Sequence, residues 1–441
     1  MPSGSSRIAG ASRLSASGET PQDDRVYMLG NTPELGEGDP SRALEMTRVT
    51  ESLWYVSVPF NSVAEVSYRF LRGASRIDDG QERTLEVAYG GQQVLAWVAS
   101  WQDQEASTVS PRPTFMAGAA LLDFWSDEFK ALMPTTLDHL KSQGVEWVDV
   151  SQIWNYGRLF PEPILENRSL QGGMLLTPMD DMRFIASEIK ARGMKLLIHA
   201  QANAEMTAEA EHVFDPHSDE WYEAYFVQFE RFMLDVAAMA QEVGADMVAV
   251  PRVMAVFQNP GYEATYNARM AEIILKMRAL YDGLITSETG APGSLQFDFH
   301  RLLDFQGVYW FEPLDVADDA PVEELQAALE ARLDGFYLEV YQRYGKPLVI
   351  MQFAYGSYAG AARMAPGGNS GDTEDQPVAL DLLAQARLYE AFFRAIASRP
   401  WVAGVFPFGY HLLDLPLDRD FSMRTKPAEA VAARWYELLS P

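Results

Sequence analysis

The strongest constraint on the fold is an eightfold alternation between apolar segments of strand length and longer amphipathic segments, which runs from Thr114 to the end of the chain. Strands that are buried on both faces read as near-continuous apolar runs, as in a parallel sheet covered by helices. Eight β/α units predict a closed (β/α)8 TIM barrel. An open doubly wound sheet is the alternative, which the lack of a glycine-rich nucleotide fingerprint disfavours. The eight predicted strands lie in residues 114–124, 146–154, 194–201, 245–253, 283–289, 305–311, 346–355 and 401–410.

The residues that precede the barrel have a different rhythm and predict a second domain. Between Arg25 and Gln102, short β-rich runs are separated by clusters of Pro, Gly, Asn and Asp, which is the pattern of a small antiparallel sandwich. The first 24 residues are polar and lack the apolar core of a signal peptide, so we expect a disordered leader. The predicted architecture is multidomain, with a leader (1–24), an all-β sandwich (25–102), a Ser/Thr/Pro-rich linker (103–113) and an α/β barrel (114–441).

Composition and charge exclude several classes of function. The 62 acidic and 35 basic residues give a formal net charge of −27, which repels nucleic-acid backbones and anionic membrane surfaces. The chain has no cysteine, which excludes disulfides, thiolate catalysis and Cys-ligated metal sites. No stretch approaches about 18 apolar residues, so we expect no membrane span. We expect a cytoplasmic protein because no signal peptide is visible; export is the open alternative, and the oligomeric state is open as well.

In a barrel of this kind the active site is built by residues at the carboxyl ends of the strands. Here those residues are aromatics, amides and carboxylates. Rings stack on the apolar faces of sugars, and amides and carboxylates bond to hydroxyls, so the predicted ligand is an oligo- or polysaccharide. No cofactor and no metal are expected, because the pattern around His212 and His217 is not that of a metal site. The predicted substrate-binding residues are Asp149, Trp154, Asn155, His199, Gln201, Arg252, Trp310, Gln352, Tyr355 and Tyr410.

The predicted sandwich resembles the family 20 carbohydrate-binding module, the starch-binding domain of many amylolytic enzymes. The resemblance rests on the segments VYMLGNTPELGEGDPSRAL, SLWYVSV, SYRFLRG and AWVASWQ. It implies a starch site of two exposed tryptophans and a lysine, but Gly38 and Gln81 occupy the tryptophan positions and Arg69 the lysine position. Because stacking supplies the main binding energy of such a site, we expect the fold to be kept and the starch affinity to be weakened. The resemblance places Trp54 and Trp101 in the core.

The predicted barrel resembles the clan A glycoside hydrolases, nearest to family 113, whose known members cleave β-mannan. The resemblance rests on LKSQGVEWVDVSQIW, TPMDDMRFIASEIKARGMKLLIHAQ, GADMVAVPRV, LLDFQGVYWFEPL, KPLVIMQFAYGSY, DLLAQARLYEAFFRAI and MRTKPAEAVAARWY. A retaining clan A enzyme needs an acid/base glutamate after the fourth strand and a nucleophilic glutamate after the seventh, about 5 Å apart. The resemblance places the first at or beside Val253 and the second at Gln352. Valine transfers no proton and an amide forms no glycosyl ester, so the usual pair is missing.

Two interpretations of the barrel follow. In the first, it is a glycoside hydrolase or transglycosidase, and Glu288 and Glu312 are the predicted catalytic pair because both follow strands of neighbouring units. A pair about 6.5–9.5 Å apart suits inversion, with Asp149 and Asp123 as reserves. The starch-binding-like domain favours an α-glucan as the substrate. In the second interpretation, the barrel is a catalytically lapsed protein that binds a glycan without cleaving it.

Overall fold

The structure is a computed structural model, in which the chain divides into two compact units. The first unit comprises residues 1–109 with 426–434, and the second comprises residues 110–425 with 435–441. No helix in the described part of the chain is long and apolar enough to cross a membrane. The described residues are 11–17, 24–48, 53–60, 65–80, 82–87, 93–98, 101, 109–121, 125–167, 177–203, 217–251, 261–288, 297–317, 319–363, 378–415 and 417–440.

The first unit is built from two β-sheets. One sheet has the strand order β4-β5-β1-β9, and the other has the order β3-β2-β6-β7, with β8 pairing on β6. All neighbours are antiparallel except β1 and β9, which run parallel. The strands are β1 (Ala11–Ser17), β2 (Val26–Gly30), β3 (Leu44–Glu45), β4 (Thr47–Arg48), β5 (Leu53–Pro59), β6 (Glu65–Arg72), β7 (Ile77–Asp78), β8 (Arg83–Glu86) and β9 (Gln93–Trp97).

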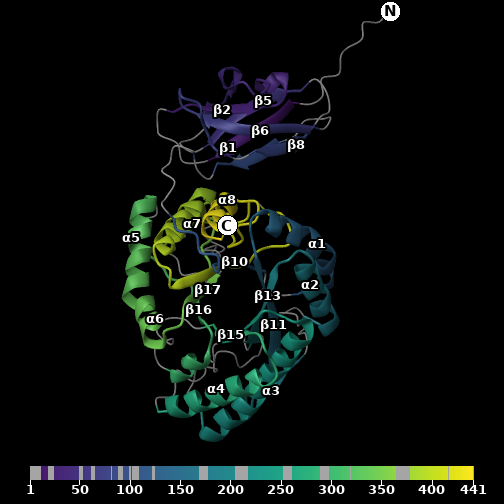
Figure 1. The fold of residues 1–441 in the computed structure, drawn as a ribbon, viewed down its shortest axis with the longest axis vertical. Coiled ribbons are helices and arrows are strands. Elements are labelled where there is room, and N and C mark those ends of the chain that lie inside the picture. The colour runs from purple at the N-terminus through teal and green to yellow at the C-terminus, as the bar shows by residue number, and fades with distance from the viewer. Residues whose placement is uncertain are drawn as a thin grey trace, which may run out of the picture. The chain divides into compact units, whose positions relative to one another are not determined.

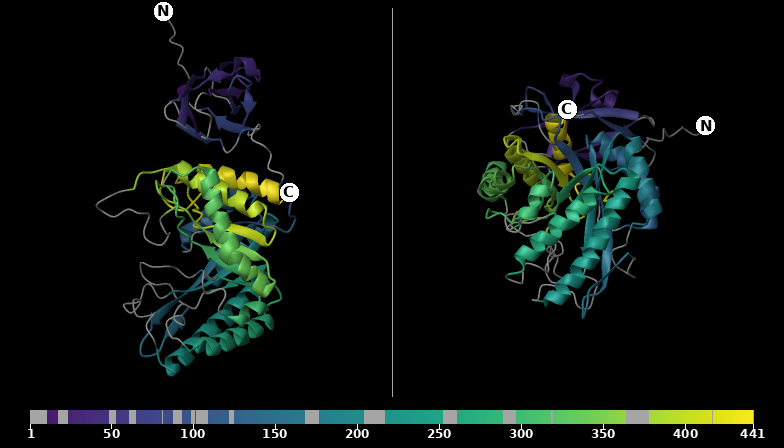
Figure 2. Two further views of the ribbon diagram at one scale, coloured as in Figure 1. Left: turned by 90° about the vertical axis from the view of Figure 1, so that its left-hand side faces the viewer. Right: turned by 60° about the horizontal axis from the view of Figure 1, so that its bottom comes forward.

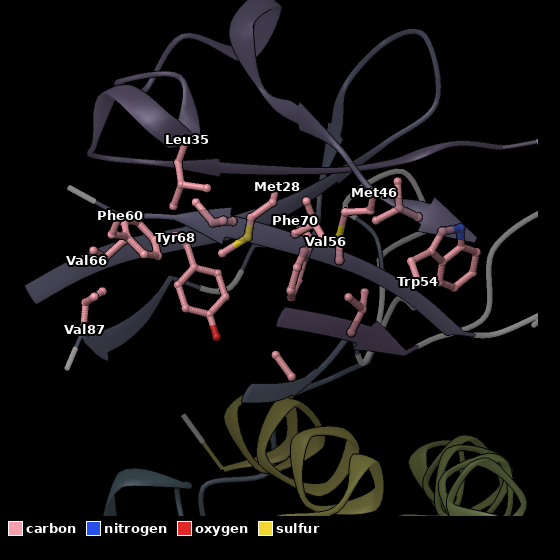
Figure 3. Packing of buried hydrophobic residues seen from close by; sticks show 14 of the residues in the cluster. Met28, Leu35, Met46, Trp54, Val56, Phe60, Val66, Tyr68, Phe70 and Val87 are labelled. Atoms are coloured by element: carbon pink, nitrogen blue, oxygen red, sulfur yellow. The ribbon is translucent and has the colours of Figure 1, made fainter. Parts of the chain in front are cut away.

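The core of this unit follows from strand alternation. Along β6, Val66, Tyr68 and Phe70 are buried, whereas Glu65 and Arg69 are exposed, because successive side chains of a strand point to opposite faces. Figure 3 shows the three buried residues within one apolar cluster that also holds Trp54. Trp54 and Trp101 belong to this cluster and are almost fully buried, so they are core residues, as the resemblance implies.

Strand β1 corrects the expected extent of the leader. Residues 11–17 lie between β5 and β9 and are hydrogen-bonded to both strands, whereas the sequence predicts a disordered segment up to residue 24. The segment ASRLSAS is small and polar, so it carries no apolar period from which a strand could be predicted. Its place in the sheet is defined by backbone pairing on both sides.

The second unit is a parallel (β/α)8 barrel that is closed except at one seam. Its strands follow the order β15-β14-β13-β11-β10-β18-β17-β16, and each begins within one of the eight predicted segments, although β11 and β13 continue beyond theirs. In Figure 1 they occupy the centre of the unit, with helices around them. The strands are β10 (Met116–Ala120), β11 (Trp147–Arg158), β13 (Lys195–Asn203), β14 (Met247–Val250), β15 (Leu284–Ser287), β16 (Gln306–Trp310), β17 (Leu348–Phe353) and β18 (Val402–Pro407).

The seam lies between β15 and β16, which are not joined by a strand ladder. Side chains link them instead: the Thr286 hydroxyl donates to the carbonyl of Phe305 at 3.2 Å, and Ser287 donates to that of Gly307 at 3.4 Å. A Cβ on Gly307 would lie 1.7 Å from the carbonyl oxygen of Ser287. The seam therefore requires glycine at this position, because only glycine allows so close a backbone approach.

Helices form the outer layer of the barrel, and Figures 1 and 2 show them around the strands. The longest, α3, begins at an N-cap where the Ser218 hydroxyl accepts from the Trp221 amide, and it ends at Gly244 with φ +63°. Both are ordinary helix termini. The helices are α1 (Asp127–Ser142), α2 (Met179–Ala191), α3 (Asp219–Val243), α4 (Glu263–Arg278), α5 (Val322–Arg332), α6 (Leu338–Tyr344) and α7 (Leu382–Ala397). The last helix, α8 (Pro427–Leu439), is divided between the two units.

Strand β11 continues beyond the other strands of the barrel. It has 12 residues, and its last part pairs antiparallel with a short strand, β12 (Ile164–Glu166). Strand β13 runs beside it as far as the pairing of Asn155 with Asn203. The sequence predicts only the first part of β11, as far as residue 154. The two strands thus form an extended wall at the carboxyl ends of the barrel strands, where the active site is expected.

Candidate active site

The barrel interior changes from apolar to polar along its strands. Trp147 on β11 and Leu197 on β13 belong to an apolar cluster that also holds Met247 and Ala249 of β14. Two residues further along β11 and β13 are Asp149 and His199, and two further again are Ser151 and Gln201. Because strand side chains alternate with a period of two, these polar residues lie on the same inward face, nearer the carboxyl ends.

Three of the predicted site residues come together in this layer. Nδ1 of His199 lies 3.4 Å from Oδ2 of Asp149, and Nε2 of the same ring lies 3.2 Å from Oε2 of Glu288. The side chains of Asp149 and His199 are 2% and 1% exposed, and that of Glu288 is 17% exposed. Glu288 follows β15 directly, and its amide donates to the carbonyl of Val250. Of the three, Glu288 is the group that solvent or a ligand reaches.

The electrostatics of the cluster favour a cationic imidazole. Burial by itself would lower the pKa of His199, but the charges and hydrogen bonds of Glu288 and Asp149 outweigh burial and raise this pKa well above its usual value. Burial raises the pKa of Asp149, and His199 opposes that effect. A cationic His199 stabilises the ionised form of the neighbouring Glu288, because opposite charges at this distance favour each other in a buried site. The site can therefore present a carboxylate at its exposed end.

An amide and a hydroxyl lie beyond this cluster. The Gln201 amide donates to the Ser151 hydroxyl at 3.1 Å across the β11–β13 pair. Gln201 is partly exposed, whereas Asn155 is fully buried further along β11. Gln201 and Asn155 are among the residues predicted from the sequence, whereas Ser151 is not. Counting two residues on from Asp149 would have found it, since that count keeps to the inward face.

Glu312, the other predicted catalytic residue, lies in a different environment. The Tyr337 hydroxyl donates to its Oε1 at 3.3 Å, and a guanidinium nitrogen of Arg332 lies 4.0 Å from its Oε2. Arg332 ends α5, and Tyr337 lies in the π-helical turn Leu333–Tyr337 that follows it. The carboxylate of Glu312 is thus held by the helical layer. The pairing of Glu312 with Glu288 stays a prediction.

Trp310 and Tyr355 are packing residues. Trp310 is fully buried, stacks on Tyr337 and meets Phe392 of α7 edge to face. Its indole N–H donates to the Tyr355 hydroxyl at 3.1 Å, which in turn donates to the backbone carbonyl of Glu312 at 2.8 Å. Neither ring is available to a sugar in this structure, because both fill the space between strands and helices.

Trp154 likewise points away from the barrel interior. It is 4% exposed, packs against Phe232 of α3 and lies under the guanidinium of Arg231. Position near the end of a strand therefore predicted the right region but the wrong face. Side chains that are an odd number of residues apart on a strand point to opposite faces. Because Asp149 points inward, Trp154 lies on the outer face of β11.

Two further predicted residues, Tyr410 and Gln352, are almost fully buried. Tyr410 follows β18, is 1% exposed and lies beneath the guanidinium of Arg424. Gln352 is 5% exposed and lies on β17 where the register with β18 shifts between Ile350 and Phe353. Arg252, Val253 and Asp123 lie outside the described residues. Among the described residues, no group of three His, Asp or Glu side chains is arranged to hold a metal ion.

The starch-site positions of the first unit carry no stacking platform where the structure describes them. Gly38 has φ +80°, a conformation that strains any residue with a side chain. Arg69, at the lysine position, forms an ion pair with Asp78 at 3.0 Å. Gln81 lies outside the described residues.

Comparisons with known proteins give the same division of the chain. The model of Glycoside Hydrolase Family 113 matches residues 128–429, and the model of the starch binding domain matches residues 13–97. The chain is similar to the family 113 β-mannanase AaManA from Alicyclobacillus acidocaldarius, with 20% identity over 73% of this chain and 97% of that chain and a TM-score of 0.59. A second family 113 β-1,4-mannanase has 18% identity over 73% of this chain and 99% of that chain, also with a TM-score of 0.59. No curated protein matches the chain.

Proposed function

Because the chain belongs to glycoside hydrolase family 113, we propose that its barrel hydrolyses a mannan-type oligo- or polysaccharide and that Glu288 is the catalytic carboxylate. The observation that carries the proposal is the contact between Oε2 of Glu288 and Nε2 of His199 at 3.2 Å, at the polar end of the barrel interior. Active sites of these barrels lie at the carboxyl ends of the strands, and Glu288 occupies that end of β15.

The proposed chemical role of Glu288 follows from its partner. A cationic imidazole keeps the carboxylate ionised, so Glu288 is suited to accept a proton from an attacking water and is poorly suited to donate one. The water would attack the anomeric carbon of a sugar bound across the mouth and give its proton to Glu288, while the glycosidic C–O bond breaks and the departing sugar oxygen takes a proton from solvent. Gln201 and Gln352 would provide amide groups for the sugar hydroxyls. Glu312 is left out of this proposal, because Tyr337 and Arg332 hold its carboxylate.

The proposed substrate differs from the α-glucan that the sequence favours. That expectation depends on the first unit, which a starch-binding-domain model matches. The bond is broken in the barrel, however, and the solved structures that the barrel is similar to are those of β-mannanases. We therefore give the barrel more weight in the choice of substrate.

Glycan binding without cleavage is the second candidate, and one observation favours it. Gln352 occupies the position where the resemblance places a nucleophilic glutamate, and its amide cannot form a glycosyl ester. Such a protein would bind an oligosaccharide through the mouth of the barrel and release no product.

One substrate panel separates these candidates. The full-length protein is incubated with β-1,4-mannan, mannooligosaccharides, soluble starch and maltooligosaccharides, and products are identified by mass spectrometry. The proposal predicts shorter mannooligosaccharides with the wild-type protein and none with Glu288→Gln. Product from starch alone would restore the α-glucan. Binding of mannooligosaccharides in calorimetry without any product would favour the second candidate.

A further inference from the structure

The contact between His199 and Glu288 spans two strand positions of the barrel. His199 lies on β13 and Glu288 follows β15, with β14 between them. At the level of His199, β14 contributes Ala249, which pairs with His199 on one side and with Thr286 on the other. Ala249 belongs to the interior cluster, and a methyl group is small enough to let the imidazole pass over it. The sequence thus provides space for the ring to reach Glu288.

Asp149 is the group that determines how the imidazole is oriented. It lies on β11, on the opposite side of His199 from Glu288, and it faces Nδ1 while Glu288 faces Nε2. Among the described residues, Asp149 and Glu288 are the charged groups that face the ring. An imidazole whose two nitrogens both face carboxylates has one favourable orientation. If the ring were turned over, carbon atoms would face the carboxylates in place of the nitrogens.

We propose that Asp149 is a positioning residue, which lies 3.4 Å from Nδ1 of His199 and so keeps Nε2 on the side of Glu288, 3.2 Å from Oε2. Asp149 is 2% exposed, so it does not itself reach a substrate at the mouth. Its effect on the reaction, which depends on the proposed function, passes through His199: a fixed cation next to Glu288 keeps this carboxylate ready to accept a proton. This arrangement resembles the way a buried aspartate orients the catalytic histidine of a serine hydrolase.

Stability gives no adequate alternative explanation for the arrangement. Removing two carboxylates and an imidazole from water is costly, and buried ion pairs are often no more stabilising than apolar residues of the same size. The neighbouring layer at Trp147, Leu197 and Met247 is apolar, so the barrel can fill this space without charges. The charged layer lies at the end of the barrel where these folds carry their chemistry.

The first test measures the protonation of His199 and needs no turnover. The full-length protein is labelled with ¹⁵N-histidine, and the His199 signals are assigned among the six histidines with a His199→Gln variant. In the wild-type protein we expect an imidazolium with both nitrogens protonated at pH 7, because the neighbouring carboxylates raise the pKa of His199. In Asp149→Asn we expect His199 to titrate at least about one pH unit lower, because one of two opposite charges is lost. An unchanged titration, or a wild-type ring that is neutral at pH 7, would overturn the proposal.

The second test uses the pH profile of kcat/KM on mannooligosaccharides. In Asp149→Asn the acidic limb should move up by about one pH unit, which lowers kcat/KM about tenfold on that limb, with KM little changed. The matched control is Asp181→Asn. Asp181 is also buried, and its carboxylate accepts hydrogen bonds from Trp125 and Lys130. It lies on α2, outside the cluster of Asp149, His199 and Glu288. A shift of the same size in Asp181→Asn would contradict a specific role for Asp149. Wild-type protein without turnover would count against the proposed function alone, and the NMR titration would still decide the role of Asp149.

Discussion

Nε2 of His199 lies 3.2 Å from Oε2 of Glu288, although the strands that carry them are not neighbours in the barrel. The contact joins the buried interior to the partly exposed mouth. Its other end is anchored by Asp149 at 3.4 Å from Nδ1. Asp149 on β11, His199 on β13 and Glu288 directly after β15 form a row of three ionisable groups, which places one partly exposed carboxylate beside an imidazole. The functional account depends on this feature.

The close approach of β15 and β16 at the seam predicts that position 307 does not tolerate a side chain. In Gly307→Ala the new Cβ would meet the Ser287 carbonyl at 1.7 Å, so backbone must move. We expect a loss of about 1–3 kcal/mol or more in the free energy of unfolding, measured by urea denaturation. Gly335→Ala is the control, because a Cβ there has no atom within 4 Å; helix propensity makes its expected change small or stabilising. Equal stability of the two variants would contradict the close approach at the seam.

His300 predicts a loss of stability in mild acid. Its ring is fully buried and stacks on Phe299, and burial lowers its pKa to about 4. The unfolded chain has a histidine pKa of about 6.5, so between pH 6.5 and 4 only the unfolded state gains the proton, and stability falls as the pH falls. Between pH 7 and 5 this amounts to about 2 kcal/mol.

The His300→Phe variant isolates this contribution. Phenylalanine retains an aromatic ring against Phe299 and Tyr344 but binds no proton. Urea denaturation at pH 7 and pH 5 should give the variant a smaller loss of stability than the wild-type protein. The other titratable groups contribute equally to both proteins. Parallel losses in both would show that His300 is not held neutral.

The first unit should bind starch weakly. Gly38 offers no ring, and Arg69 is paired with Asp78, so the stacking energy of the usual site is missing. The measurement is retention of the full-length protein on granular starch, with calorimetry of a cyclic maltooligosaccharide. We expect little retention and no difference between the wild-type protein and Arg69→Ala. Tight binding that Arg69→Ala abolishes would contradict this prediction.

Much of the fold could be predicted because the barrel strands are buried on both faces and carry an apolar signal of their own. Residues 11–17 could not, because a small polar segment acquires its strand structure from the two strands that flank it. The short strand β12 pairs with the extension of β11, and three residues are too few to show the alternation from which a strand is predicted.

The site was predicted in part for a similar reason. Position near a strand end indicated Asp149, His199 and Glu288, which the structure brings together. The same criterion does not tell the inner face from the outer, and it therefore also selected Trp154 and Trp310, whose rings pack against helices. Once the structure has placed one residue of a strand in the interior, counting in steps of two along that strand shows which other side chains point inward. The sequence alone does not provide that first residue.

Turnover of β-1,4-mannan by the wild-type protein, Glu288→Gln and Glu312→Gln tests the central claim most directly. The account predicts cleavage by the wild-type protein, a fall in kcat of about a hundredfold or more in Glu288→Gln, where the amide cannot accept the proton, and a change of less than about threefold in Glu312→Gln. Undiminished turnover in Glu288→Gln, or its loss in Glu312→Gln alone, would contradict it.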